Sequence, residues 1–269
     1  MIYSYSFGDF YVRHAIDEEP CDRDFTMHIH QVCEIYFFVS GDVKYLVEGS
    51  EYMLDNNSLL ILRPSEVHKP KILTGERYER FTVNFPIDFA RSIDPDGRLT
   101  EMFVEKTLGK NNLFRSSEVD MKLIKSLFCE MCKEREEAEM QLAIKTHLVY
   151  MLDILMRAYS KRENTENDLE SLGERMVTYV NTHLLDDISV PRLAKHFYLS
   201  SSQFSRVFKL ATGASPWVYV TKKRLSVARE KIRAGATAQS AAEECGFRDY
   251  SSFYRAYTKH FGIAPTLDA

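Results

Sequence analysis

The sequence predicts an α+β protein in which an N-terminal antiparallel β-barrel with flanking helices precedes an all-α domain with two helix-turn-helix units. Short runs of β-branched and aromatic residues occupy about the first 86 residues, helical spacing of apolar residues continues to residue 159, and a helical pattern occurs twice after residue 171. A chain of 269 residues can hold two separate cores. We therefore expect domains at 1–160 and 172–269, joined by a linker at 161–171.

The composition is that of an ordinary globular protein, with 45% apolar and 28% charged residues. No apolar run approaches the roughly 18 residues that a membrane span needs, and the first residues lack the basic-then-apolar order of a secretion signal. The five cysteines, an odd number in a chain without an export signal, indicate reduced thiols. We expect a cytoplasmic protein with no membrane partner.

Five segments of the N-terminal part have the composition of short strands, and glycine, asparagine and proline separate them. They are FTMHIH (25–30), EIYFFVS (34–40), VKYLVEG (43–49), SLLILRP (58–64) and YERFTVNF (78–85). Many short strands at close spacing favour an antiparallel barrel or sandwich.

From Ile87 to Tyr159, leucine and methionine recur at three- and four-residue steps, as on one face of an amphipathic helix. The pattern predicts two antiparallel helices within 117–159, which either pack against the barrel or pair with a second copy of the chain. The segment KRENTENDLES at 161–171 is polar, which is typical of a linker.

The last hundred residues or so contain an internal repeat with an offset of 49 positions. In each copy a Ser or Asp can cap a helix, aromatic residues four and eight positions later share one helix face, and Gly followed by Pro ends the unit. The aligned pairs are Ser200 with Asp249, Ser202 with Ser251, Phe204 with Phe253, Arg206 with Arg255, Phe208 with Tyr257, Gly213 with Gly262 and Pro216 with Pro265. Because a short helix and a turn precede each capped helix, the repeat predicts two helix-turn-helix units.

Two such units suit double-stranded DNA, because an α-helix fits the major groove and its first turns can reach base edges. The segment 215–235 between them is expected to form one helix of about 20 residues, hence about 30 Å long, close to the roughly 34 Å of one DNA turn. Residues 171–269 contain 14 Lys and Arg against 8 Asp and Glu, a net charge of +6, which leaves −10 for the first 170 residues. This asymmetry indicates that only the C-terminal part meets a polyanion.

The candidate DNA contacts lie on the faces of the two predicted recognition helices that are opposite the aromatic residues. Arg206 and Arg255 are the strongest candidates, because a guanidinium can form two hydrogen bonds to a guanine or a phosphate. The other candidates on these helices are Ser201, Ser202, Gln203, Ser205, Lys209, Tyr250, Ser251, Ser252, Tyr254 and Lys259. In the connecting helix, Lys222, Lys223 and Arg224 are candidates for neutralising phosphates.

The C-terminal part resembles the AraC/XylS family of transcription regulators over about residues 180–265. The first unit, LAKHFYLSSSQFSRVFKLATGASPWVYV followed by KKRLSVA, is similar to the family's pattern of Leu-Ala, Ser, Phe-Ser-Arg, Phe-Lys, Gly and Ser-Pro. The second, AAEECGFRDYSSFYRAYTKHFGIAP, is similar to its signature of Gly-Phe, Asp, Ser, Phe, Arg, Lys, Gly and Pro. The ending PTLDA departs from the family, because it lacks the usual aromatic and basic residues.

The resemblance implies a transcription regulator, not an enzyme, with a cupin-like N-terminal domain that binds a small-molecule effector and forms a dimer. A sugar or sugar derivative is the effector that the resemblance suggests. The expected partners are double-stranded DNA, the effector and a second copy of the chain, and RNA polymerase is a further candidate.

His28, His30 and Glu34 form the strongest chemical pattern outside the helix-turn-helix units. Residues two and four apart in a strand share a face, so these side chains are expected to point into the barrel, where His68 can join them from another strand. Imidazoles with a carboxylate suit Fe, Mn, Ni or Zn. The spacing resembles the first cupin motif, although Asp22 stands where that motif begins with Gly, and the second motif, a Pro before a His, is looser here.

Two interpretations of this cluster stay open: a divalent metal ion held in the barrel, or histidines that hydrogen-bond within the barrel or to an effector. Tyr36 and Phe38 continue the parity of Glu34 and are candidates for the wall of the same cavity. Two rival functions also stay open. A cupin metalloenzyme, such as a dioxygenase or isomerase, would hold a metal with an open coordination position, and a sensor that acts through a protein partner would bind DNA with weak specificity.

Overall fold

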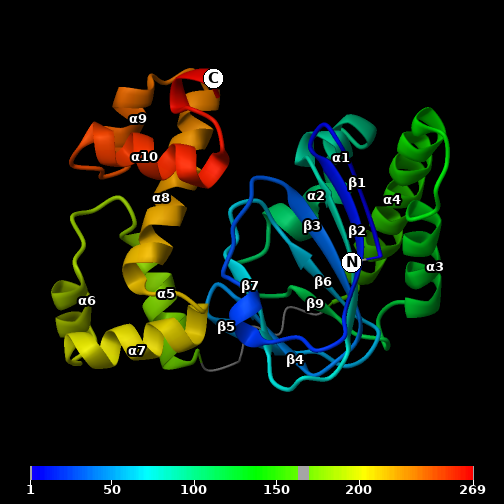
Figure 1. Ribbon diagram of the computed structural model, residues 1–269, viewed down its shortest axis with the longest axis horizontal. Coiled ribbons are helices and arrows are strands. Elements are labelled where there is room, and N and C mark those ends of the chain that lie inside the picture. Colours follow the sequence, from blue (N-terminus) through cyan, green and yellow to red (C-terminus); the bar gives the residue numbers. More distant parts are fainter. Residues whose placement is uncertain (1, 163–169, 269) are drawn as a thin grey trace.

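The computed structural model describes residues 2–162 and 170–268, and it contains a β-rich part followed by a helical part (Figure 1). The elements of the β-rich part lie within residues 3–159, and those of the helical part lie within residues 172–267. An α+β fold with an N-terminal antiparallel sheet domain and a C-terminal helical domain is thereby confirmed. Most of the linker expected at 161–171 lies outside the described residues.

Two antiparallel sheets form the β-rich part, one with the strand order β1-β2-β8-β3-β6-β9 and the other with the order β5-β4-β7. The strands are β1 (Tyr3–Phe7), β2 (Phe10–Asp17), β3 (Cys33–Ser40), β4 (Val43–Val47), β5 (Ser50–Met53), β6 (Ser58–Leu62), β7 (His68–Ile72), β8 (Tyr78–Phe85) and β9 (Leu113–Phe114). The segment 25–30, which was expected to be a strand, forms only an isolated bridge, in which His28 pairs with His68. Conversely, the five predicted segments do not include β1, β2, β5, β7 or β9.

Side chains of β3 alternate between two cores, as the period of two in a strand requires. Ile35 and Phe37 point to a cluster on the outer face of the six-stranded sheet, whereas Tyr36 and Phe38 belong to a second cluster to which both sheets contribute. Glu34, Tyr36 and Phe38, which the sequence placed on one face of a strand, therefore lie on the face of β3 that points between the two sheets.

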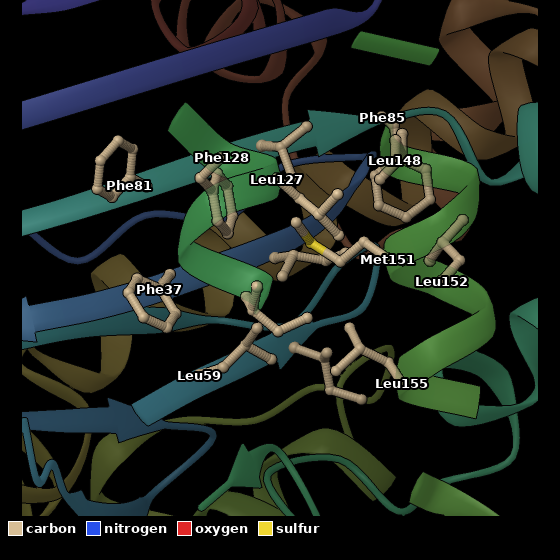
Figure 2. Packing of buried hydrophobic residues seen from close by; sticks show 14 of the residues in the cluster. Phe37, Leu59, Phe81, Phe85, Leu127, Phe128, Leu148, Met151, Leu152 and Leu155 are labelled. Carbon is tan, nitrogen blue, oxygen red and sulfur yellow. The ribbon is translucent and has the colours of Figure 1, made fainter. Parts of the chain in front are cut away.

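Four helices cover the outer face of the six-stranded sheet: α1 (Ile87–Ile93), α2 (Arg98–Val104), α3 (Met121–Met131) and α4 (Glu137–Tyr159). Figure 2 shows Leu127 and Phe128 of α3 and Met151 of α4 packed against Phe37 and Phe81 of the sheet. The two helices predicted within 117–159 thus bury their apolar faces within the chain. Leu142 and Tyr150 of α4 nevertheless stay exposed.

The helical part consists of α5 (Leu172–Thr182), α6 (Val190–His196), α7 (Ser201–Thr212), α8 (Pro216–Arg233), α9 (Ala238–Glu244) and α10 (Tyr250–Phe261). The predicted caps are confirmed, because the side chains of Ser200 and Asp249 accept hydrogen bonds from the first turns of α7 and α10. Gly213 and Gly262 end these two helices in the left-handed conformation, also as predicted. The helix α8 has 18 residues, about 27 Å at 1.5 Å per residue.

The end of the chain contributes to the second unit through Asp268. Its carboxylate accepts hydrogen bonds from Arg229 and Arg233 of α8, each at 3.1 Å, and from the hydroxyl of Tyr257 of α10 at 2.9 Å. Asp268 therefore links α8 to α10.

Candidate functional site

The two recognition helices, α7 and α10, each bury their aromatic residues and expose the opposite face. Phe204 and Phe208 of α7 are buried, as are Phe253 and Tyr257 of α10. The predicted contact residues that are exposed are Ser201, Ser202, Gln203, Arg206, Lys209, Ser251, Ser252, Tyr254, Arg255 and Lys259, while Ser205 and Tyr250 are half-buried. Figure 1 shows α7 and α10 crossing opposite ends of α8. The arrangement leaves both candidate faces free of the protein core.

Gln203 has a local partner that the sequence did not reveal. Its side-chain oxygen accepts hydrogen bonds from the backbone nitrogen and the hydroxyl of Ser200, at 3.0 and 2.9 Å, and the Ser200 hydroxyl in turn accepts from the Gln203 nitrogen. This reciprocal capping box fixes the start of α7. Ser202 and Arg206 remain on the exposed face beyond it.

The structure contradicts the expectation that Arg224 meets a phosphate, because this residue is buried. Its guanidinium donates hydrogen bonds of 2.7–2.8 Å to the backbone oxygens of Leu184, Asp186 and Gly246. These acceptors come from the segments on either side of α8, so Arg224 holds the two helix-turn-helix units together.

Lys222 and Lys223 are also engaged within the chain, so neither is a free phosphate contact. Lys222 donates to the backbone oxygen of Met27 at 2.6 Å. The buried ammonium group of Lys223 lies 2.7 Å from a carboxylate oxygen of Glu48 and donates to the backbone oxygen of Ser65 at 2.9 Å. Lys222 and Lys223 therefore attach the helical part to the β-rich part.

Glu48 lies at the tip of the hairpin between β4 and β5. Both turn residues, Glu48 and Gly49, have positive φ angles of 47° and 88°, which is typical of a two-residue hairpin turn. The second carboxylate oxygen of Glu48 accepts from the amide nitrogen of Asn181 at 2.9 Å and from the hydroxyl of Tyr219. Burial alone would raise the pKa of the Glu48 carboxyl, but the Lys223 charge and the hydrogen bonds from Lys223, Tyr219 and the Val67 backbone hold the pKa below its usual range.

Apolar residues complete this interface. Met27, Ile29 and Val67 of the β-rich part belong to one cluster with residues of the helical part that include Val177 and Tyr219. The two parts therefore share a core in addition to the buried ion pair, and apolar burial of this kind stabilises their mutual position.

The segment 27–30 and the start of β7 have two different faces. His28 and His68 exchange backbone hydrogen bonds of 3.0 Å, so their side chains lie on the same side, and His30, two residues on, shares it. The intervening Ile29 and the neighbouring Val67 point the other way, into the cluster shared with the helical part. Segment 27–30 and the start of β7 thus carry histidines on one surface and the contact with the helical part on the other.

Backbone carbonyl oxygens hold three imidazole rings by their Nδ1 atoms. The Nδ1 atoms of His28, His30 and His68 lie 3.1, 2.8 and 2.8 Å from the carbonyl oxygens of Thr26, Val32 and Glu66, respectively. Since a carbonyl oxygen can only accept, each Nδ1 donates to it, and Nε2 is the ring atom that faces other partners. Backbone acceptors at the other ring nitrogen are the usual support of metal-ligating histidines.

The free ring atoms converge on Glu34. Its carboxylate oxygen lies 2.8 Å from Nε2 of His30 and 3.7 Å from Nε2 of His68, and it accepts from the amide nitrogen of Asn84 at 3.1 Å. One possible ligand atom from each of His28, Glu34 and His68 lies within 4.8 Å of the others. The buried Nε2 of His68 has no hydrogen-bond partner among residues 2–162 and 170–268. The structure therefore brings together all four predicted residues.

The charges in this cluster are coupled. Burial and the neighbouring His68 ring lower the pKa of His28 to about 3. Burial alone would raise the pKa of the Glu34 carboxyl, but the imidazoles of His30 and His68 hold the pKa well below its usual range. At neutral pH the cluster thus presents a carboxylate and at least one unprotonated imidazole nitrogen, which is the donor chemistry that a divalent cation needs.

Tyr36 and Phe38 lie in the apolar cluster between the sheets. Among the described residues, neither forms a hydrogen bond with the histidines. The hydroxyl of Tyr36 bonds to that of Tyr78. Sequence reasoning missed Tyr45, whose ring stacks on His68 at 6.1 Å and packs on Tyr36 at 4.8 Å between centroids. Tyr45 therefore connects the histidine cluster to Tyr36, and no pattern in the sequence pointed to it.

These features define a class of protein: a transcription regulator in which a ligand-binding domain is attached to a helix-turn-helix DNA-binding domain. Residues 12–152 match the family described as the AraC-like ligand binding domain, and residues 193–267 match a helix-turn-helix domain family. Because the first match alone spans more than half of the sequence, the chain belongs to the AraC family of regulators.

The chain is similar to the HTH-type transcriptional activator RhaS of Escherichia coli, with 24% identity over 259 residues, 93% of this chain and 90% of the relative. Among solved structures it is similar to ToxT from Vibrio cholerae O395, with a TM-score of 0.39, 12% identity and 96% of both chains covered. It is also similar to the DNA-binding domain of AdpA in complex with a target DNA, with a TM-score of 0.35, 23% identity, and 36% of this chain and 89% of that chain covered. Within the described residues, none of the helices has the length and apolar character that a bilayer crossing requires.

Proposed function

We propose that this regulator acts as a homodimer, binds specific DNA sequences through α7 and α10 together, and responds to an effector held by the histidine cluster. The observation that carries the DNA part is the exposure of Arg206 and Arg255 at corresponding positions of two recognition helices at the two ends of α8. The length of α8, about 27 Å, suits two successive major grooves on one side of a duplex.

Selection of binding sites from random duplex DNA with the full-length protein tests the DNA part. We expect the recovered sites to share two short motifs about one helical turn apart, one for each unit. Gel-shift titrations would then show much tighter binding to a recovered duplex than to a scrambled one. Equal binding to both would contradict specific recognition and favour the rival in which the protein acts through a protein partner.

For the effector site, we propose that His28, His30, Glu34 and His68 bind a divalent metal ion. The unpartnered Nε2 of His68 and the three backbone-fixed imidazoles support this proposal. A bound ion would supply positive charge opposite the Glu34 carboxylate and would tie segment 27–30 to β7. Membership of a regulator family favours sensing over catalysis as the role of such an ion.

Metal analysis of the purified protein and calorimetric titration with Zn²⁺, Ni²⁺ and Mn²⁺ test this site. We expect about one ion per chain, and an affinity at least about tenfold lower for His68→Gln. His147→Gln is the control, because the ring of His147 bonds to the Ala143 carbonyl on α4, outside the cluster. Substoichiometric metal and no binding by any ion would leave the cluster as a hydrogen-bonding site and set the metalloenzyme rival aside.

A small polar molecule such as a sugar is a second candidate effector. Aromatic rings beside hydrogen-bonding side chains form the usual lining of sites for such molecules, and the ring of Tyr45 lies between Tyr36 and His68. Thermal-shift measurements with a panel of monosaccharides, with and without divalent ions, would separate this candidate from a metal ion acting alone.

The remaining parts of the proposal have less direct support. Exposed Leu142 and Tyr150 on α4 favour a dimer contact along this helix, and a contact with RNA polymerase and a cytoplasmic location follow from the class of protein. The domain limits that we propose are 1–160 and 172–269 with a linker at 161–171. The end of α4 at Tyr159 and the cap of α5 at Ser171 support them.

A further inference from the structure

A pocket of about 240 Å³ lies where the C-terminal end of α7 meets the outer face of the three-stranded sheet. Both domains contribute to its lining. The lining residues are Asp22, Leu46, Lys69 and Lys71 from the ligand-binding domain and Arg206, Lys209, Leu210 and Gly213 from the DNA-binding domain. The pocket thus includes Arg206, the strongest candidate for a DNA contact in the first unit.

The lining is strongly cationic. Asp22 is its one carboxylate, and it is already occupied, because it bonds to the ammonium group of Lys69 at 2.9 Å and to the backbone nitrogen of Ile72 at 3.2 Å. Lys71, Arg206 and Lys209 form no ion pair with any residue in the described part of the chain. Three unpaired cations around one opening favour an anionic partner from outside the protein.

Lys69 joins this edge of the sheet firmly to α7. A Cβ atom placed on Gly213 would lie 2.7 Å from Cδ of Lys69, so the end of α7 sits directly on the lysine side chain. Lys71 is two residues further along β7 and therefore projects from the same face as Lys69. Lys71 consequently keeps a constant position relative to Arg206 and Lys209 while the domains are docked.

We propose that this edge of β7 is part of the DNA-binding surface, and that Lys71 binds a backbone phosphate of the duplex whose major groove α7 enters. The inference rests on the DNA-binding function proposed above. The helix α7 has 12 residues and is about 18 Å long, whereas the major groove is about 12 Å wide, so the end of the helix at Lys209 reaches the phosphates that border the groove. Lys71 extends that contact from the ligand-binding domain.

Fluorescence anisotropy with the full-length protein and a duplex recovered by site selection tests this proposal across a range of salt concentrations. A lost phosphate contact lowers the slope of log affinity against log salt by about 1. We expect this change for Lys71→Ala, together with roughly threefold weaker binding at low salt, and a larger loss for Lys71→Glu. The controls are Lys122→Ala and Lys122→Glu on α3, an exposed position on the other side of the sheet domain (Figure 1).

Each outcome separates the inference from the function on which it rests. If the wild-type protein binds no duplex specifically, the proposed function fails. If it does, but the Lys71 and Lys122 variants behave alike, the Lys71 contact is refuted. Tighter binding by the Lys71 variants would also overturn it, because the edge of the sheet would then oppose DNA.

Lysine acetylation followed by mass spectrometry distinguishes a DNA phosphate from a free one. We expect the recovered duplex to protect Lys71 from acetylation, and inorganic phosphate at the same ionic strength to leave it reactive. Equal protection by inorganic phosphate alone would identify the pocket as a site for small anions and contradict the proposal.

Discussion

The carboxylate of Glu48, at a hairpin tip of the ligand-binding domain, lies 2.7 Å from the ammonium group of Lys223 in α8 of the DNA-binding domain. The two residues are 175 positions apart in the sequence, and both are buried. A buried ion pair gives a defined geometry to an interface, since either partner alone would be an uncompensated charge. The position of the DNA-binding domain thus depends on a contact with the ligand-binding domain.

Glu48→Gln is expected to destabilise the protein, because it leaves the Lys223 charge buried without its partner. We expect the free energy of unfolding to fall by about 3 kcal/mol, measured by urea denaturation followed by circular dichroism. The control is Glu51→Gln, three residues away on β5, whose partly exposed pair with Lys44 is worth less than about 1 kcal/mol. Equal losses in the two variants would show that the Glu48 pair has no special role.

The contribution of Glu48 should depend on pH in a definite direction. Its folded pKa lies below the ordinary value of 4.5, so the stabilisation is fully present above about pH 4.5 and is lost as the pH falls through the folded pKa. The difference in unfolding free energy between wild type and Glu48→Gln should be constant from about pH 7 to pH 5.5 and then shrink toward acid. Glu34, whose pKa is also lowered, is present in both proteins and cancels from the comparison. A difference that grows toward acid would contradict this assignment.

Gly213 and Gly262 offer a matched pair, because they occupy equivalent positions of the repeat with φ angles of 76° and 72°. Gly262→Ala should cost about 1 kcal/mol for the left-handed conformation alone, since nothing lies within 4 Å of an added Cβ. Gly213→Ala should cost more, because its Cβ would meet Lys69. Thermal denaturation measures both effects. The extra destabilisation of Gly213→Ala over Gly262→Ala should largely disappear when Lys69→Ala is added. If it persists, contact with Lys69 is not its cause.

Arg206→Ala and Arg255→Ala are each expected to lower the affinity for a selected duplex by about 1–3 kcal/mol if the arginine reads a base. Binding to a scrambled duplex should change much less, so the ratio of the two affinities is the measured quantity. Arg157→Ala on α4 is the control, because it removes an exposed arginine that pairs only locally with Asp153. A uniform loss on both duplexes would assign the arginine to a phosphate instead.

Local signals account for the accuracy of the sequence analysis in the DNA-binding domain. Ser200, Asp249, Gly213 and Gly262 act on the few residues next to them, so their effects can be read from spacing alone. Lys222, Lys223 and Arg224 were misassigned to phosphates because a charged residue type does not reveal a distant partner. Glu48 lies in a hairpin turn, where a glutamate is ordinarily solvated, and nothing nearby indicates that α8 covers it.

In the histidine cluster, too, local spacing was predictive and long-range contacts were not. The period of two predicted that His28, His30 and Glu34 share a face, and the structure agrees, although segment 27–30 is held by a single bridge. Tyr45 and Asn84 come from other strands, and the register that brings them to the cluster depends on long-range pairing that one sequence does not encode in any simple pattern.

Under the function proposed above, effector binding and the contact with the DNA-binding domain lie on two different faces of segment 27–30. Exchanging the buried Met27 or Ile29 would disturb the apolar contact with the DNA-binding domain, whereas exchanging His28 or His30 would, under the function proposed above, alter the effector site and leave that contact intact. Point substitutions at the histidines alone could then change the effector that the proposed site binds. Inserting or deleting one residue here would instead swap the two faces and disable both at once.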